Sequence, residues 1–446
     1  MVSAAEQLTQ NMNFGVLAKA TELKKRIWFT LGLLIIYRLG TYIPLPGIDP
    51  VIMADIFKHN SGGILGMFDM FSGGAVSRMS IFALNIMPYI SASIIVQLLT
   101  AVVPSFEAMK KEGEAGRKKI NQYTRYGTVV LAAVQAYGIA VGLEGMTGSV
   151  GSAVTDPGMF FRLTTVITLT GGTVFLMWMG EQITARGIGN GSSLIIFAGI
   201  VANLPRALAQ LFELGRTGAI STGFLLFLIV MCVAVIAFIV FVERAMRRIV
   251  VQYPRRQVGN SMTAGDASFL PMKLNTSGVI PPIFASSLLL LPLTFAGFAH
   301  GDSPEWLRTI ASTIGHGQPA YMGLYALLII FFAFFYTAII FNPAETAENL
   351  RKYGGFVPGI RPGATTANYL DYVLTRITVL GSLYLAGICL LPEFLIAKHS
   401  LPFYFGGTSL LIVVSVTMDT VAQINAHLIQ HQYEGLIKKA KLRGRK

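Results

Sequence analysis

The sequence predicts an all-α polytopic membrane protein with ten transmembrane helices. Of its 446 residues, 53% are hydrophobic and only 13% are charged, and the mean hydropathy is +0.60. A soluble domain of this length could not bury so much apolar surface. Ten apolar runs are long enough to cross a bilayer, and the basic residues between them gather on alternate loops.

The first predicted helix covers residues 27–43 and follows a polar tail, residues 1–26, that ends in Lys-Lys-Arg. A signal peptide can show the same charge pattern, but a Pro-Leu-Pro-Gly stretch stands where a small-residue cleavage site would be. We therefore expect an uncleaved membrane helix. Arg38 lies near its far end, where it either reaches to the membrane interface or pairs inside the bundle.

The next apolar region is interrupted. Residues 64–70 are apolar, but at ~1.5 Å per residue so short a helix reaches only about halfway through a bilayer. Residues 79–103 are long enough to span, yet they include Pro88 and several polar side chains. Ile86 and Ile90 share one helix face. Broken helices with apolar rings backed by polar groups favour a pathway through the membrane, and a proline-kinked packing helix is the alternative.

Eight further apolar runs complete the set of ten. They cover residues 124–143, 160–179, 193–212, 222–242, 276–297, 321–341, 372–391 and 407–428. With the N-terminus inside, 27 of the 35 lysines and arginines lie in inside segments and 7 in outside segments. This bias places both termini, including a basic tail at residues 431–446, in the cytoplasm.

Ten helices can form two sets of five, and an odd number in each set inverts the second half relative to the first. The first half would be residues 27–212 and the second half residues 222–430, with a central pore at their interface. Long cytoplasmic loops would lie at residues 244–273 and 342–371. The sequence itself shows no clear internal identity between the halves.

Catalytic and cofactor chemistry is not indicated. Cys232 and Cys389 lie inside apolar runs, so no disulfide framework or metal site is predicted. The glycine-rich residues 186–191 follow no strand, and the chain contains no GxxxxGK[ST] motif for a nucleotide. His427 and His431 lack a third ligand or a glutamate between them. We expect no enzyme, no cofactor and no bound metal.

The two cytoplasmic loops are basic and long for connectors between helices. One contains Arg255 and Arg256, and the other contains Arg361 in a Pro-Gly-Ile-Arg-Pro-Gly turn, whose prolines would present the arginine stiffly. Topology signalling and lipid contact explain such charges on their own. Docking of an acidic partner or of ribosomal RNA phosphates is the alternative.

Several motifs resemble the SecY family, the channel subunits of the bacterial Sec protein translocase. The motifs are FSGGAVSRMSIFALNIMPYISASIIVQLLT, KKEGEAGRKKINQYTRYGT, MWMGEQITARGIGNGSSLIIFAGIV, FVERAMRRIVVQY, GVIPPIFASS, FFYTAIIFNPAETAENLRKYGGFVPGIRPG and PFYFGGTSLLIVV. Together they extend over nearly the whole chain. The resemblance implies a channel that translocates unfolded secretory polypeptides across the bacterial inner membrane and releases apolar segments laterally into lipid.

The resemblance also implies site residues. It places a plug at residues 64–78, including Gly66, Phe68, Asp69, Phe71, Ser72, Gly73 and Gly74. It places a ring of pore-lining side chains at Ile86, Ile90, Ser192, Ile196, Ile283 and Ile412. It places a lateral gate at Ser91, Gln97 and Asn275, and a docking surface for cytoplasmic partners at Arg255, Arg256 and Arg361.

A narrow ring of isoleucines excludes water and ions, while its flexible side chains can still close around a passing polypeptide. Ser192 departs from this pattern, because a hydroxyl would loosen one side of the seal. The resemblance further implies SecE and SecG as partner subunits, and the SecA motor or the ribosome at the cytoplasmic face. Those partners would supply the energy, because the chain lacks a nucleotide site.

A secondary transporter for a small solute is the rival interpretation, since it would also use broken helices and inverted repeats. Transporters that couple to ions usually bury ionisable groups near the middle of the membrane. The predicted spans contain almost none there, because Arg38, Glu243 and Asp419 lie toward helix ends. The large basic loops also disfavour the rival.

Overall fold

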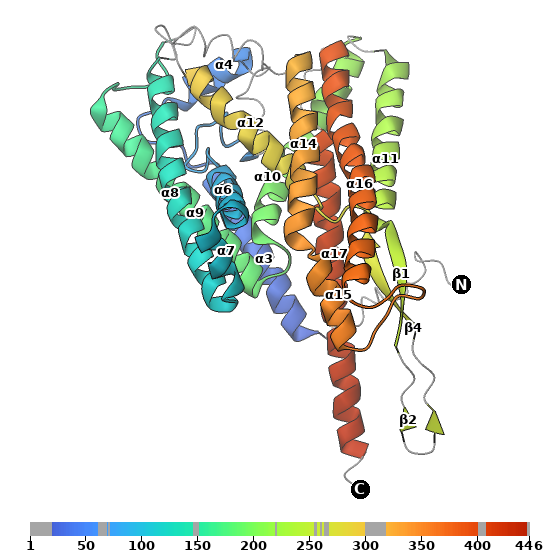
Figure 1. The fold of residues 1–446 in the computed structure, drawn as a ribbon. Coiled ribbons are helices and arrows are strands. Elements are labelled where there is room, and N and C mark those ends of the chain that lie inside the picture. The colour runs from blue at the N-terminus through green and yellow to red at the C-terminus, as the bar shows by residue number, and fades with distance from the viewer. Residues whose placement is uncertain are drawn as a thin grey trace. The chain divides into compact units, whose positions relative to one another are not determined.

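The computed structural model describes residues 20–60, 69, 72–145, 151–218, 221–253, 257–258, 261–262, 267–298, 318–399 and 407–443, and helices dominate these ranges (Figure 1). The helices, in chain order, are α3 (Thr21–Gly40), α4 (Pro50–Asn60), α6 (Met87–Val102), α7 (Pro104–Lys111), α8 (Glu114–Glu144), α9 (Met159–Arg186), α10 (Gly191–Arg216), α11 (Thr222–Arg244), α12 (Ile280–Phe298), α14 (Pro319–Ile340), α15 (Pro343–Lys352), α16 (Ala364–His399) and α17 (Gly407–Arg443). The strands are β1 (Met246–Gln252), β2 (Gln257–Val258), β3 (Ser261–Met262) and β4 (Ala267–Lys273).

Each of the ten predicted spans overlaps one of these helices, so the helical membrane fold is confirmed, with four short strands in addition. Within the described ranges, seven helices are long and apolar enough to cross a bilayer, namely α8, α9, α10, α11, α14, α16 and α17. An eighth span results if α6 and α7, which meet at a bend of 96°, count together. The number ten is therefore consistent with the structure without being fixed by it.

The second predicted span begins later than expected. The sequence predicts a helix from residue 79, but α6 begins at Met87, and residues 81–86 form turns. The Leu45 N–H donates to the Met79 carbonyl at 2.9 Å, and the Ile81 N–H donates to the Ile43 carbonyl at 3.0 Å. These bonds pair Ser80 with Pro44 in an isolated β-bridge, and the helix starts only where Pro88 fits its first turn.

Contacts divide the chain into two compact units. The first contains the described residues up to Gln210, residues 294–298, and those from Ile412 onward. The second contains the described residues from Leu211 to Leu293 and from 318 to Leu411. The predicted division into inverted halves at residues 212 and 222 concerns topology and remains a prediction.

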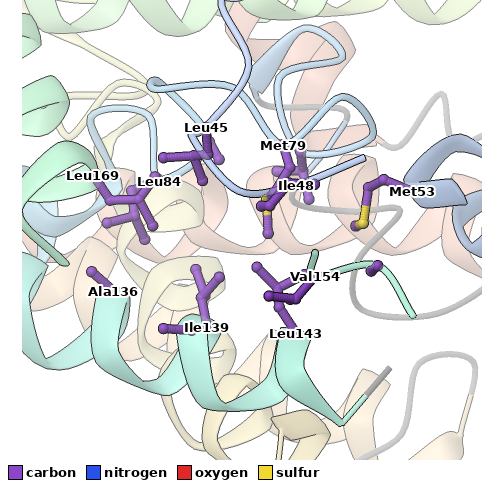
Figure 2. Packing of buried hydrophobic residues seen from close by; sticks show 14 of the residues in the cluster. Leu45, Ile48, Met53, Met79, Leu84, Ala136, Ile139, Leu143, Val154 and Leu169 are labelled. Carbon is purple, nitrogen blue, oxygen red and sulfur yellow. The ribbon is translucent and has the colours of Figure 1, made fainter. Parts of the chain in front are cut away.

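The first unit has a core built around the chain that leads into α6. Figure 2 shows Leu45 and Ile48, which follow α3, and Met79, which precedes α6, facing Ile139 and Leu143 of α8. The helices α8 and α9 pack along each other beside it. The small side chains Ala132, Ala136 and Ala140 lie on the inner face of α8, which lets the irregular backbone approach the helix closely. Apolar packing therefore fixes a non-helical segment within a helical bundle.

The second unit contains the described parts of the two predicted cytoplasmic loops, and both include regular secondary structure. The strands β1 and β4 pair antiparallel, with Met246 opposite Lys273. The loop at residues 342–371 begins with α15, which packs on α16. Gln252 of β1 exchanges both backbone hydrogen bonds with Phe356, each at 2.9 Å, so the two loops are joined. A shared apolar cluster that includes Ile249, Met272 and Leu374 stabilises this arrangement.

Candidate functional site

The described part of the predicted plug is a turn, residues 72–78, preceded by Asp69. Gly73 and Gly74 adopt φ angles of 70° and 85°, which glycine reaches without the steric cost that a Cβ atom would add. The Ser77 N–H donates to the Asp69 carboxylate at 2.7 Å, and the Gly74 N–H donates to the Asp69 carbonyl at 3.0 Å. We call residues 72–78 the plug turn. The predicted plug residues Gly66, Phe68 and Phe71 lie outside the described residues.

Side chains from the end of α3 bind the plug turn. Tyr37, which is fully buried, donates its hydroxyl proton to the Ser72 carbonyl at 3.2 Å. Arg38 Nη1 donates to the Gly73 carbonyl at 2.5 Å, and Arg78 Nη2 donates to the same oxygen at 3.2 Å. One backbone carbonyl thus accepts hydrogen bonds from two guanidinium groups, and charged donors make the stronger class of hydrogen bond.

Tyr42 positions these two arginines. The Arg78 guanidinium carbon lies 4.0 Å from the centre of the Tyr42 ring, and that of Arg38 lies 5.2 Å from it. Arg38 Nη2 also donates to the Tyr42 hydroxyl at 3.3 Å. The structure therefore decides between the two alternatives for Arg38. This arginine makes an internal contact, and its main partner is the Gly73 carbonyl rather than an acidic side chain.

The helix α10 forms a second wall of the plug turn. Asn203 Nδ2 donates to the Asp69 carbonyl at 3.2 Å. A Cβ atom at Gly73 would lie 3.0 Å from both the Cα and the carbonyl oxygen of Gly199, so the two backbones are nearly in contact. Because residues 199 and 203 are four apart, they lie on one face of α10.

Two predicted ring residues lie on the same face of α10. Ser192, Ile196, Gly199 and Asn203 follow one another at intervals of four, three and four, which is one row along a helix. Ile196 is 2% exposed, and it lies about one helical turn, ~4.5 Å of rise, from Gly199. The plug turn therefore contacts the face of α10 that carries these ring residues.

The other ring positions are also buried. Ile86 is fully buried, and its Cδ1 atom and the Ser192 nitrogen each lie 3.5 Å from the point that a Cβ of Gly180 would occupy. Gly180 of α9 therefore lets the start of α6 approach the start of α10. Ile90 is 7% exposed and Ile412 is fully buried. Ile283 belongs to the second unit, where it is 7% exposed, so the closed ring remains a prediction.

The Ser192 hydroxyl has a partner of its own. Its Oγ donates to Asn190 Oδ1 at 2.7 Å, and the same oxygen accepts the Ser192 N–H at 3.2 Å. The Asn190 side chain thus caps the beginning of α10, and the Ser192 hydroxyl proton is already engaged by it.

The predicted gate residues lie in different surroundings. Ser91 is buried, and Gln97 Nε2 donates to Ser93 Oγ at 3.2 Å. Among the described residues nothing bonds to Gln97 Oε1, although that atom is buried. Asn275 Nδ2 donates to Glu243 Oε1 at 2.7 Å and to the Gly278 carbonyl at 3.1 Å, so its amide is engaged within the second unit.

Arg361 is exposed on a well-anchored turn. Gly359 and Gly363 on either side of it have φ angles of 81° and 109°, and Thr366 Oγ1 donates to the Arg361 carbonyl at 2.9 Å. Val357, just before the turn, is buried in the cluster shared with β1. Arg255 and Arg256 lie outside the described residues.

The sequence reasoning missed the side chains that bind the plug turn from outside it. Tyr37 and Asn203 each place a polar group within an apolar run, which was the available signal. Gly199 and Asn203 also continue the helical row of Ile196, so a search along that row would have found them.

Taken together, the apolar helices and the buried turn that lies against one of them are those of a polytopic membrane protein of the channel class. The SecY family model matches residues 80–421. The protein translocase subunit SecY of Rickettsia typhi is 54% identical over 424 residues, 95% of this chain and 98% of that protein. The corresponding subunit of Escherichia coli strain K12 is 56% identical over 424 residues, 95% of this chain and 96% of that protein. The chain therefore belongs to the SecY family.

Solved structures show the same fold. A structure of a protein-conducting channel matches with a TM-score of 0.60 at 16% identity, covering 90% of this chain and 92% of that one. Sec61 in the canine ribosome-channel complex from the endoplasmic reticulum matches with a TM-score of 0.57 at 16% identity, with the same coverages. The predicted resemblance is confirmed by these comparisons.

Proposed function

We propose that this chain is the protein-conducting channel subunit of a Sec translocase. Unfolded secretory polypeptides cross the bilayer through it, and apolar segments leave it sideways into lipid. The observation that carries the proposal is the plug turn, which Tyr37 and Arg38 of α3 bind and which lies against the row of α10 that includes Ile196. The relatives at 54% and 56% identity are translocase subunits, which favours a channel over the transporter alternative.

The arrangement suits a pathway that is closed at rest. The plug turn is buried and hydrogen-bonded through its backbone, so it fills space without depending on large side chains. The isoleucines at positions 86, 90, 196, 283 and 412 would close around a passing chain, because aliphatic side chains adapt their rotamers and exclude water. Ser192 would loosen one side of this seal, although its hydroxyl proton is engaged by Asn190.

Lateral release needs a seam that opens at low cost. Ser91 and Gln97 of α6 and Asn275 before α12 are our candidates for it. The buried Gln97 Oε1 supports this role, because it accepts no hydrogen bond from the described part of the chain. Leaving such an acceptor unbonded is costly, so opening of the seam would be favoured if it gave this oxygen a donor. Asn275 would act indirectly, by fixing the entry to α12 through Glu243 and Gly278. Interhelical hydrogen bonds in membranes average about 0.6 kcal/mol, which an apolar signal sequence can displace.

Cytoplasmic partners would dock on the basic loops. The exposed Arg361, on its anchored turn, supplies bidentate hydrogen bonds for acidic side chains or phosphates. Relatives of the same fold are solved with ribosomes, which supports ribosomal RNA as one partner. We propose the SecA motor as the alternative cytoplasmic partner, with Arg255 and Arg256 as further docking residues. We also propose SecE and SecG as the small subunits of the complex.

We place the chain in the bacterial inner membrane with both termini in the cytoplasm. This placement is supported by the basic residues, of which 27 lie in segments assigned to the inside and 7 in segments assigned to the outside. The bacterial relatives support it as well.

The test is ion conductance in a planar bilayer, comparing the intact complex with one that lacks residues 66–77. The intact channel should be nearly silent, and the deletion should give large, poorly selective currents. Vesicles that contain the intact complex should take up an unfolded secretory polypeptide when the motor and ATP are present. Silence in both forms, together with uptake of a small solute, would instead establish the transporter.

A further inference from the structure

One face of α16 is exposed along much of its length and combines polar and apolar side chains. The opposite face is buried, through Leu370, Leu374 and Ile377, in the apolar core of the second unit. The exposed row runs through Asn368, Asp371, Tyr372, Thr375, Arg376, Val379, Leu380, Leu383 and Gly387. The second half of this row, from Val379 to Gly387, is uncharged, as on helix faces that contact lipid.

The polar end of this face forms a shallow groove of about 490 Å³. It is lined by Asn368, Asp371, Tyr372, Thr375 and Arg376. The Arg376 guanidinium carbon lies 4.2 Å from the centre of the Tyr372 ring, so the arginine is held by a cation–π contact that leaves its N–H edges available. In the described part of the chain, no side chain makes a hydrogen bond or an ion pair with the Arg376 guanidinium or with the Asp371 carboxylate.

The groove lies where a lipid headgroup would be. Residues 377–392 form an uninterrupted uncharged run, so Arg376 marks the end of the hydrocarbon-embedded part of α16. Val379, Leu380 and Leu383 are 41%, 59% and 57% exposed, and they follow Arg376 at intervals of three, four and seven on the same side of the helix. An acyl chain can lie along these side chains while its headgroup occupies the groove.

The charges of the groove select the headgroup. An anionic lipid would satisfy Arg376 but would place its phosphate near the Asp371 carboxylate without compensation. A headgroup with a phosphate and a primary ammonium matches both side chains, since guanidinium binds phosphate well and a carboxylate accepts N–H bonds. A quaternary ammonium cannot donate such bonds.

We propose that this groove binds a zwitterionic phospholipid whose phosphate pairs with Arg376 and whose primary ammonium pairs with Asp371. Phosphatidylethanolamine has this chemistry. The proposal concerns a specific lipid site and is independent of whether the chain conducts polypeptides.

The test is lipid retention by native mass spectrometry of the purified full complex in detergent. Phosphatidylethanolamine, phosphatidylcholine and phosphatidylglycerol with identical acyl chains would be added in equal amounts. The unaltered protein should retain phosphatidylethanolamine best. Arg376→Gln should lower that retention about tenfold, the factor expected for one lost charge-assisted hydrogen bond. Asp371→Asn should remove the preference over phosphatidylcholine.

Arg351→Gln is the matched control, because Arg351 is an exposed arginine of α15 outside the groove, and it should change nothing. Both groove side chains are exposed, so equal melting temperatures should show that the variants fold. Glycerophosphoethanolamine, which lacks acyl chains, should not displace the lipid. Preference of the unaltered protein for phosphatidylglycerol, or unchanged retention in Arg376→Gln, would overturn the proposal.

Discussion

Replacing Gly73 with alanine should destabilise the closed channel. Gly73 has a φ angle of 70°, and a left-handed conformation costs a residue with a Cβ atom roughly 1–2 kcal/mol. The new methyl group would also lie 3.0 Å from the backbone of Gly199 and 3.0 Å from Arg38 Nη1. If the Gly199 backbone or the Arg38 guanidinium moves away from this methyl group, its contact with the plug turn weakens. We expect a total cost of about 2 kcal/mol, which lowers the ratio of closed to open channels roughly 30-fold.

The assay is conductance of the complex in a planar bilayer, with open probability as the readout. Gly113→Ala is the matched control, because Gly113 has a φ angle of 77° but no atom lies within 4 Å of the position of the added methyl group. The Gly113→Ala variant has the same left-handed backbone strain, but its new methyl group does not contact the plug turn. The open probability of this variant should therefore equal that of the unaltered protein. If Gly73→Ala is equally silent, or if both variants leak alike, the plug turn does not seal the channel through this contact.

Three further changes test other parts of the site. Ser192→Ile should reduce the leak of a channel without its plug by about half, because it completes the apolar ring, and an unchanged current would contradict this expectation. Asn275→Leu should lower stability by about 1–3 kcal/mol, because it removes one partner of Glu243, and it should relax the requirement for a signal sequence in a translocation assay. Arg361→Glu should abolish motor- or ribosome-dependent translocation while resting conductance is unchanged, whereas Arg361→Lys should retain part of the activity. Normal translocation by Arg361→Glu would remove this arginine from the docking surface.

Much of the architecture could be predicted because hydropathy reports which segments leave water. The apolar runs marked every predicted span, and the helices overlap all of them. The uneven distribution of basic residues among the loops and the family motifs can likewise be recognised from the sequence alone. The motifs predicted a plug and a ring of isoleucines, and the isoleucines at 86, 90, 196, 283 and 412 are all buried.

Hydropathy could not predict where α6 begins. Residues 79–86 are apolar enough for a helix, but the backbones of Met79 and Ile81 pair with residues 43–45, which are far away in sequence. A backbone group in a membrane must find a hydrogen-bond partner, and either a helix or a neighbouring segment can supply it. Local sequence does not reveal which of the two is present.

The sequence by itself determined that this chain is a polytopic helical protein of the SecY family, because composition, periodicity and motifs are properties of single segments. Only the tertiary structure decided that Arg38 turns inward to the Gly73 carbonyl, and that Gly199 and Asn203 form the wall behind the plug turn. Those contacts join residues that are separated by 35 to 134 positions. Their energies depend on distance and orientation in space, which no local pattern encodes.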